Sequence, residues 1–497
     1  MDRSPWGKSF LLESFIYGEK MKYIKNIFLG LLIFAAGIFM SCEFEENGIS
    51  LSVKEPEYTE IDGDFQECND ERLWTILIYM AADNNLESAA IEDLCELESS
   101  KINSNKVSIF VLIDRNQNYD TSNDNWTGCR LYKLSSGNAA GSKSIKSTEI
   151  SCEKIGLIAG QNTELDMSST YVLSGSLDFV MSRYPAQNYG LIVWGHGTGW
   201  RSQNLIEEYD EGLFKGFCSD ASSDCIMTLY QFSDALKTGL GEKKLNFLGF
   251  DTCYGGEIEI LYQLRDSASF IAGSEGLIAF SGWDYKYLFD YFEEEGLYSS
   301  HSLAKATVEQ FKEKYTYTSR ASIIVSDQSY VSDYVDSFNK LTDFCAKKIS
   351  NLQIHKEVFD ILYSGNPCPT EKYTYGKENY DVYLDISSMA ENLNAYFSTN
   401  DNLSENEKSE LKFLYENFLE LDKKIFLESW ASDREKGGAG VYFSTLSSNG
   451  LLSLTHPSAY ICDSTYYQID FVKDCKGYVP LKETGESLLD KLFYTQF

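Results

Sequence analysis

The chain has 497 residues and a formal net charge of −32, with 43 lysines and arginines against 75 aspartates and glutamates. This acidity argues against nucleic-acid binding, because a phosphate backbone attracts clustered lysine and arginine. The length allows two or three domains, and a hydrophobic content of 43% is ordinary for a globular protein. The sequence has no GxxxxGKS/T, strand-linked GxGxxG, HExxH or paired CxxC motif, so it predicts neither nucleotide chemistry nor a zinc site.

The N-terminal region has the layout of an export signal. A basic segment, Met21–Lys25, precedes a largely apolar stretch of 14 residues, Ile27–Met40, which has the length of a signal-peptide core and is too short to span a bilayer. Cys42 and an acidic stretch follow, an arrangement that resembles a bacterial lipoprotein signal. We therefore expect residues 1–41 to be a leader and signal peptide, and Cys42 to be lipidated and to anchor an exported lipoprotein to a membrane. The expected location is the outer membrane or cell surface, with the periplasmic face as an alternative.

Residues 42–70 are acidic and polar without sustained periodicity, which predicts a tether. From Leu73 onward, apolar runs alternate with amphipathic stretches. In chain order these patterns predict a strand at Leu73–Tyr79, a helix at Leu86–Leu97, a strand at Val107–Ile113, an edge strand or hairpin at Trp126–Lys133, a helix at Leu173–Met181, a strand at Leu191–Trp194, a helix at Tyr230–Leu240, a strand at Leu245–Phe250 and a helix at Ile258–Leu264.

Strands that alternate with helices predict an α/β fold, with a largely parallel sheet covered by helices on both faces. We assign this domain to residues 71–330. We expect residues 331–497 to form a mixed α+β region that packs on the sheet, with a recognition surface as the alternative. The remaining patterns predict helices at Leu303–Tyr315, Ser332–Lys348 and Glu405–Phe426, strands at Ser322–Val325 and Gly438–Phe443, and a segment at Tyr380–Ser387 that leads into another helix.

Two of the predicted strands end close to reactive side chains. His196 lies two residues beyond Trp194, and Cys253 lies three residues beyond Phe250. Since ligands bind at the carboxyl ends of parallel strands, both side chains are expected where a site belongs. A thiol is a strong nucleophile only as thiolate, and a nearby imidazole can hold its proton. The chain has only four histidines, and the other three are better interpreted as surface or packing residues, so the pattern predicts a Cys/His site.

Glycines adjoin both side chains. Gly195 and Gly197 flank the histidine and leave room for a substrate, and Gly255 and Gly256 follow the cysteine. We expect a helix to start behind Cys253, where its N-terminus would lower the pKa of the thiol and direct backbone N–H groups toward an oxyanion. Each residue also has an ordinary interpretation when it is considered alone. His196 could simply hydrogen-bond to a loop, and Cys253 could pack as a small hydrophobic side chain. The ten cysteines other than Cys42 and Cys253 show no framework spacing, so both disulfides and free thiols stay open.

Six short segments together resemble the clostripain family (C11) of cysteine peptidases, which is grouped with caspases, legumains and gingipains. Their order and spacing, more than any single tetrapeptide, carry the resemblance over roughly residues 74–443. It implies a caspase-like α/β/α sandwich. The segments are Thr75–Leu86 (TILIYMAADNNL), Trp194–Gly197 (WGHG), Gly249–Cys253 (GFDTC), Ala272–Glu275 (AGSE), Gly282–Tyr285 (GWDY) and Gly438–Phe443 (GAGVYF).

The resemblance implies a cysteine endopeptidase that acts on peptides or proteins. Cys253 would attack the peptide carbonyl and His196 would protonate the leaving amine, with the N–H groups of Cys253 and Gly197 as the oxyanion hole. The alternative is a catalytically inactive relative that binds peptides or surface partners through the same groove. The sequence does not indicate an oligomeric state.

The resemblance also implies cleavage after Arg or Lys, which requires a carboxylate at the base of the first substrate pocket. Asp251 matches one such acid, with a loop-capping aspartate as its ordinary interpretation. The family's second acid falls on Ser281 in this chain, which predicts a weaker or broader preference. Asp284 or Glu275 could compensate, although the former could cap a turn and the latter could face solvent.

The interval Arg201–Thr228 between the two motifs is polar and acidic. Some members of the family cut themselves in this interval, and Arg201 or Lys215 would be the cleavage point here. Calcium dependence is also implied by the resemblance, but the chain lacks the Asp-x-Asp-x-Asp-Gly spacing of a calcium loop, so no metal ligand is assigned. No other cofactor is expected.

Overall fold

The computed structural model describes residues 72–116, 119–200, 217–318, 320–364, 371–375, 379–433, 437–447, 466–480 and 485–493. The predicted leader, Cys42 and the predicted tether lie outside these residues. In the part of the chain that is described, no helix has the length and apolar character needed to cross a membrane.

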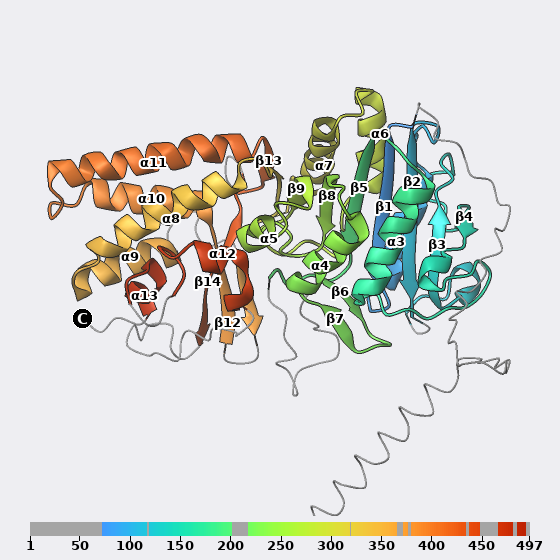
Figure 1. Cartoon of the computed structure of the whole chain (residues 1–497), viewed down its shortest axis with the longest axis horizontal. Helices are drawn as coiled ribbons and strands as arrows, with labels where there is room; N and C mark the ends of the chain where they lie inside the picture. Colours follow the sequence, from blue (N-terminus) through green and yellow to red (C-terminus); the bar gives the residue numbers. More distant parts are fainter. Residues whose placement is uncertain are drawn as a thin grey trace, which may run out of the picture. The chain divides into compact units, whose positions relative to one another are not determined.

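The main sheet forms because apolar runs of the chain are buried on both faces. Within the described residues it has nine strands (Figure 1). The five central strands, β2, β1, β5, β8 and β9, are parallel, and β3, β4, β10 and β13 join antiparallel to their neighbours. Across the sheet the order is β13 (Glu428–Ala431), β10 (Ser322–Asp327), β9 (Ala268–Gly273), β8 (Leu245–Asp251), β5 (Asn188–Trp194), β1 (Trp74–Ala82), β2 (Val107–Arg115), β3 (Gly128–Lys133) and β4 (Thr148–Ile150).

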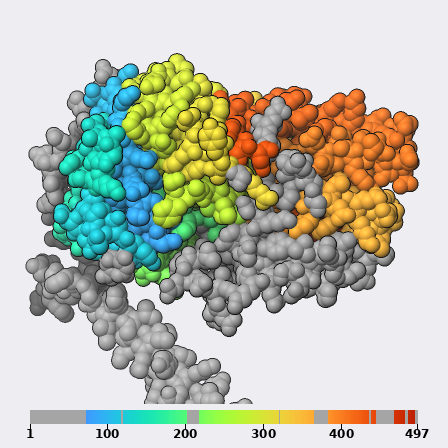
Figure 2. Space-filling view, turned by 180° about the vertical axis from the view of Figure 1, so that it is seen from behind, coloured from blue at the N-terminus to red at the C-terminus, as the bar shows by residue number. Residues whose placement is uncertain are grey.

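Alternate residues of each strand enter two different cores, as the two-residue repeat of a strand requires. In β1, Leu77 and Tyr79 pack with α3 (Thr170–Arg183), α4 (Leu229–Leu240) and α5 (Ile258–Gln263). Ile76 and Ile78 pack on the opposite face, with α2 (Glu87–Glu98), α6 (Tyr285–Glu295) and α7 (Ser300–Tyr315). Figure 2 shows the second face, where blue residues of the first elements adjoin yellow-green residues of α6 and α7. The predicted α/β/α sandwich is therefore confirmed.

Local signals in the sequence explain where several helices begin. Thr228 caps α4 and Ser299 caps α7, each by a reciprocal pair of hydrogen bonds with the third helical residue. Asp284 caps α6 through its carboxylate. Sequence analysis did not predict α6, β9 or β13 as elements, and the segment predicted at Trp126–Lys133 begins as a strand only at Gly128.

The C-terminal region shares a core with the sheet. Its helices α8 (Val331–Lys348), α9 (Leu352–Ser364), α10 (Ile386–Ser398) and α11 (Glu405–Ile425) accompany a second sheet of β11 (Glu371–Tyr375), β12 (Asn379–Asp385) and β14 (Gly440–Ser447). A hairpin, β6 (Phe217–Asp220) with β7 (Cys225–Met227), and the short helices α12 (Asp470–Asp474) and α13 (Leu488–Phe493) complete the described elements.

Two links tie this region to the main sheet. Strand β13 pairs with β10, and the Gly440 N–H donates to the Gly256 carbonyl at 3.1 Å. Buried residues of the C-terminal region, such as Tyr442, belong to the same core as those of α5. The boundary at residue 330 therefore stays a prediction, because one continuous core extends across it.

We expect Phe250→Ala to destabilise the protein by about 3–5 kcal/mol, since it removes a fully buried ring and leaves a cavity. The ring lies 5.2 Å from that of Phe217 and 5.6 Å from that of Phe232, measured between centroids. Urea unfolding measures the change. Tyr230→Ala, at a side chain that is 65% exposed, is the control and should change stability by less than about 0.5 kcal/mol. Equal effects of the two variants would contradict this description of the core.

Candidate active site

The site begins where two neighbouring parallel strands end level with each other. In the pairing of β5 with β8, Trp194 lies opposite Asp251, so His196 and Cys253 each follow two residues later. The Gly195 N–H donates to the Asp251 carbonyl at 3.3 Å. A Cβ atom at Gly197 would lie 2.5 Å from the Cys253 carbonyl oxygen, so only glycine fits there. The structure thus brings the two predicted loops into contact.

His196 is partly buried and its ring orientation is fixed by Asn85. The distance between His196 Nε2 and Asn85 Oδ1 is 2.7 Å. An amide oxygen can only accept, so Nε2 carries the proton and Nδ1 is the acceptor in the neutral ring. Burial lowers the pKa of His196, which favours this neutral form near pH 7. Sequence analysis missed Asn85, which follows β1 and lies 111 residues before the histidine.

Cys253 lies beside the backbone of a segment that follows β9. The Ile278 N–H donates to the Cys253 sulfur at 3.4 Å, and the thiol donates to the Ile278 carbonyl at 3.9 Å. The described cysteines are all free, and Cys253 is half-buried whereas six of the others are buried and Cys225 is exposed. Among these thiols, Cys253 alone lies at a strand end of the main sheet beside the histidine loop.

The helix predicted after Cys253, Ile258–Leu264, is confirmed as α5 (Ile258–Gln263). Helix α5 begins at Ile258, and the N–H groups of Tyr254 and Gly256 donate to the carbonyls of Gly276 and Ser274. The residues between Cys253 and α5 form a tight turn. Tyr254 adopts a left-handed backbone with a φ of +60°, and a Cβ atom at Gly255 would lie only 2.3 Å from the Cβ atom of Phe250. Gly255 and Gly256 therefore allow this turn to pack closely against β8 and the segment at the end of β9, and they do not form the N-terminus of a helix.

Glu257 holds the histidine loop against this turn. Its carboxylate is fully buried and accepts the Trp200 N–H at 2.9 Å. Gly199, with a φ of +72°, leaves room for the same carboxylate, because a Cβ there would lie 2.1 Å from its Oε2. Nothing in the sequence identified Glu257, since acidic residues are common throughout this chain.

Asp251 is buried at the end of β8 and is only 2% exposed. Both carboxylate oxygens accept the Trp283 N–H, at 3.2 and 3.1 Å, and a Cβ at Gly282 would lie 2.9 Å from Oδ2. Burial raises the pKa of Asp251 to about 6, while the Trp283 N–H, the Tyr285 hydroxyl and Lys314 act in the opposite direction. The carboxylate thus fixes the turn that carries Ser281, as a loop-capping aspartate would.

The other predicted pocket residues are not all directed toward substrate. Ser281 is exposed, and its hydroxyl lies 3.3 Å from that of Tyr315. Asp284 accepts the Tyr287 N–H at 2.7 Å as the cap of α6. Glu275 is fully buried and accepts the Gly438 N–H at 3.1 Å, so the expectations that it lines the pocket or faces solvent are both wrong. Arg201 and Lys215 lie outside the described residues.

Lys314 is a cation beside this turn that sequence analysis missed. Its ammonium group donates to the Ser281 carbonyl at 2.6 Å and the Trp283 carbonyl at 3.1 Å. Several acids lie around it. Burial and the charge of Asp251 raise the pKa of Asp93, and burial and the charge of Asp284 raise that of Glu96. Burial thus favours the neutral forms of Asp251, Asp93 and Glu96, and Lys314 is a cation that lowers the pKa of each.

One group of side chains could hold a metal ion. Oxygens of Asp83, Asp114, Glu164 and Asp220 all lie within 4.8 Å of one another. No pattern in the sequence marked them, because they come from four separate segments.

The chain has an α/β/α sandwich that places a thiol and an imidazole on adjoining loops at the strand ends. This combination is that of the caspase-like cysteine peptidases. The model of the clostripain family, Peptidase_C11, matches residues 78–483, and the chain belongs to this family. Proteases of this family act on peptides or proteins.

Relatives and solved structures agree with this assignment. Clostripain from Hathewaya histolytica is 25% identical over an alignment of 433 residues, and the match covers 79% of this chain and 76% of that protein. An inactive zymogen C11 protease from Parabacteroides distasonis covers 82% of this chain and 98% of its own, with a TM-score of 0.53 and 18% identity. A secreted C11 cysteine protease from Bacteroides thetaiotaomicron, in complex with an irreversible peptide inhibitor, covers 81% and 98%, with a TM-score of 0.52 and 18% identity. The predicted fold and family are therefore confirmed.

We expect the stability of wild type and Asp251→Asn to diverge with pH. The pKa of Asp251 is raised in the folded state, so ionising this group opposes folding as pH rises from about 4 to about 6. The asparagine variant lacks this penalty and should gain about 3 kcal/mol relative to wild type between pH 4 and pH 7. Urea unfolding at both pH values measures the difference.

The matched control is Asp266→Asn, at an exposed aspartate after α5. Its stability should follow wild type in parallel across this pH range. Parallel curves for Asp251→Asn as well would contradict a raised pKa.

Proposed function

We propose that the chain is a cysteine endopeptidase that uses Cys253 as nucleophile and His196 as proton carrier. The contact between the two loops, with Gly197 against the Cys253 carbonyl, is the observation that carries this proposal. Asn85 supports it, because it holds the imidazole in the tautomer whose Nδ1 can accept a proton.

The chemistry follows in two steps. The Cys253 sulfur attacks the peptide carbonyl, its proton passes to His196, and the imidazolium then protonates the amine as the C–N bond breaks. Water next attacks the thioester, giving a carboxylic acid and the restored thiol. The N–H groups of Gly197 and Cys253 would stabilise the oxyanion in both steps, as donors aimed at developing charge do.

The proposed cleavage follows Arg or Lys, with Asp251 at the base of the first pocket. A cationic side chain beside Asp251, Asp93 and Glu96 would favour their ionised forms and gain three carboxylate neighbours, which supports this proposal. Ser281 stands where the family has its second acid, and the ammonium group of Lys314 already lies beside this turn. A preference for basic residues that is real but weaker than that of a two-carboxylate pocket is therefore proposed.

We expect Cys253→Ala to lower kcat/KM for peptide cleavage by roughly a thousandfold or more, because the attacking atom is lost. The assay uses a panel of fluorogenic peptides that differ only in the residue before the scissile bond: Arg, Lys, Gln, Leu and Asp. Cys225→Ala is the matched control, since this thiol is exposed in the β6–β7 hairpin and has no role in the proposed chemistry, so its loss should leave cleavage unchanged.

Two results of the panel would overturn parts of the proposal. Cleavage of no peptide by the wild type, or equal cleavage by Cys253→Ala, would leave the inactive peptide-binding relative as the better description. Faster cleavage after Leu than after Arg would remove Asp251 as the pocket carboxylate while leaving the nucleophile in place.

We further propose that the peptidase is an exported lipoprotein held to a membrane through Cys42. The basic segment, the apolar stretch and Ser41-Cys42 support this. Radiolabelled palmitate should enter the wild type and a Cys68→Ala control, and should not enter Cys42→Ala. Equal labelling of Cys42→Ala would disprove lipidation at this residue.

A further inference from the structure

The segment that follows β9 exposes consecutive apolar side chains beside the nucleophile. Leu277 is 45% exposed and Phe280 57% exposed, Ala279 is also exposed, and Ile278 is half-buried. Among the large apolar side chains that are exposed in the described ranges, Leu277 and Phe280 alone lie within three residues of each other. Single exposed apolar side chains are ordinary, but a consecutive run of them indicates a surface that binds something.

Hydrogen bonds on both sides of this run fix its backbone. Before it, the Tyr254 N–H donates to the Gly276 carbonyl at 2.9 Å. After it, the Gly282 N–H donates to the Ala279 carbonyl at 2.9 Å and closes a turn, and the Tyr315 hydroxyl donates to the Gly282 carbonyl at 2.6 Å. The apolar side chains are thus held at the surface before any ligand arrives, which reduces the entropy that binding costs.

The run lies within reach of any substrate that the nucleophile attacks. The Ile278 N–H is the group that contacts the Cys253 sulfur, at 3.4 Å. Consecutive Cα atoms are about 3.8 Å apart, so the Cα atom of Leu277 lies about 4 Å from that of Ile278, and that of Phe280 at most about 8 Å from it. Substrate residues close to the scissile bond therefore pass beside both side chains.

The order of strands decides which part of the substrate meets this run. Cys253 follows β8, and the two neighbours of β8 in the sheet are β5, which leads to His196, and β9, which leads to residues 277–280. In the proposed chemistry His196 protonates the leaving amine, so the part of the substrate after the scissile bond lies on the histidine side. The part before the scissile bond then lies on the side of β9.

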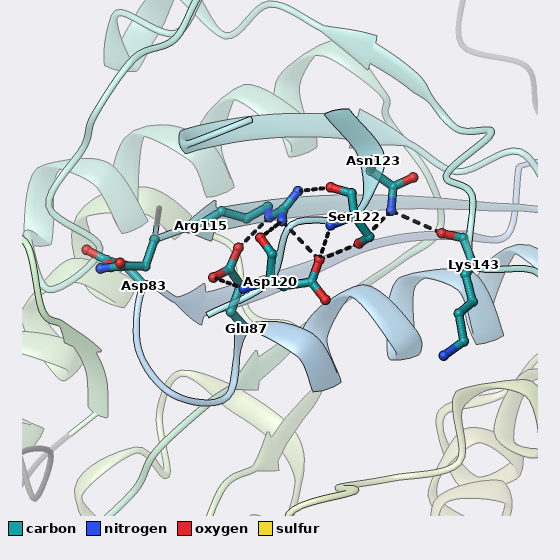
Figure 3. A network of polar contacts seen from close by, with 8 residues as sticks. Asp83, Glu87, Arg115, Asp120, Ser122, Asn123 and Lys143 are labelled. Atoms are coloured by element: carbon teal, nitrogen blue, oxygen red, sulfur yellow. Dashed lines mark hydrogen bonds and ion pairs between the residues drawn. The ribbon is translucent and has the colours of Figure 1, made fainter. Parts of the chain in front are cut away.

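The histidine side offers polar groups instead. His196 contacts Asn85, and the helix that follows Asn85 is fixed in its first turn by Glu87, whose carboxylate contacts Arg115 at 2.6 Å. Figure 3 shows this polar network, with Arg115 directed at Glu87 and Asp120. Because only the β9 side is apolar, it favours apolar substrate residues on one side of the scissile bond.

We propose that Leu277 and Phe280 form a subsite for an apolar side chain in the second or third position before the scissile bond. The first position belongs to the pocket at Asp251 and Ser281, and Ser281 directly follows Phe280. Burial of apolar surface on both partners stabilises the contact, and no charge is involved. This inference rests on the function proposed above and adds a preference that does not depend on the residue in the first pocket.

Peptides that keep Arg before the scissile bond and differ only in the second or third position, as Leu, Ser, Asp or Lys, test the subsite. We expect kcat/KM for the better leucine peptide to exceed that for the matching serine peptide by about tenfold in the wild type. Leu277→Ser and Phe280→Ser should each reduce this ratio to about threefold or less, because apolar contact area is lost. The ratio is compared because a general loss of activity lowers both rates alike.

Leu297→Ser is the matched control, since this leucine is 72% exposed and lies after α6, outside the apolar run. It should keep the wild-type ratio. Phe280→Leu should also keep most of the ratio, because the contact requires apolar area and not an aromatic ring. Equal cleavage of leucine and serine peptides by the wild type, or an unchanged ratio in both serine variants, would refute the subsite.

Peptide binding separates this inference from the proposed function. In Cys253→Ala, fluorescence anisotropy of labelled peptides measures Kd without cleavage, and the leucine peptide should bind about tenfold more tightly than the serine peptide. Adding Phe280→Ser should remove most of this difference. If the wild type cleaves no peptide while the difference in Kd persists, the peptidase proposal fails and the subsite stands. Cleavage without any preference for leucine, in rate or in Kd, leaves the peptidase and removes the subsite.

A second copy of the chain is the other partner that such a surface could bind. Sedimentation of the wild type and Phe280→Ser at the same concentration distinguishes the two partners, and we expect equal masses. A wild-type dimer that Phe280→Ser dissociates, with the peptide preference unchanged, would assign the surface to a contact between copies and overturn the proposal.

Discussion

The parallel pairing of β5 with β8 is the interaction on which the site depends. Because Trp194 lies opposite Asp251, both strands end at the same level and the loops that follow run against each other. The glycine after the histidine then permits an approach that any Cβ would block. A slip of either strand by one residue would turn its side chains to the other face and separate the thiol loop from the imidazole loop.

Buried carboxylates are the second constraint, and they account for part of the chain's acidity. Asp251, Glu257 and Glu275 each accept a backbone N–H from a segment distant in sequence. Burying a charge is tolerable only when hydrogen bonds replace its hydration, and backbone amides supply them here. Part of the chain's excess of acidic residues is therefore buried, where these carboxylates join the turns around Cys253.

The sequence predicted those features that depend on local pattern. Apolar runs with glycine at their ends placed His196 and Cys253 at strand ends, and amphipathic stretches placed most helices. It could not predict Asn85, Lys314 or Glu257, because each acts through a contact between segments far apart in the chain. The helix after Cys253 was predicted at the residue where α5 begins, but the bonds from the N–H groups of Tyr254 and Gly256 to the carbonyls of Gly276 and Ser274 were not. The four-acid cluster likewise has no linear signature, since the fold alone brings its members together.

The order of strands in the sheet has a consequence for chain continuity. β1, β2 and β5 precede residues 201–216, and β8, β9 and β10 follow them, so the two halves of the sheet meet along the ladder between β5 and β8. A single break of the backbone in that interval would leave every strand pairing among the described residues in place. The two resulting polypeptides would stay joined by the hydrogen bonds between β5 and β8. One polypeptide would carry the imidazole of His196 and the other the thiol of Cys253.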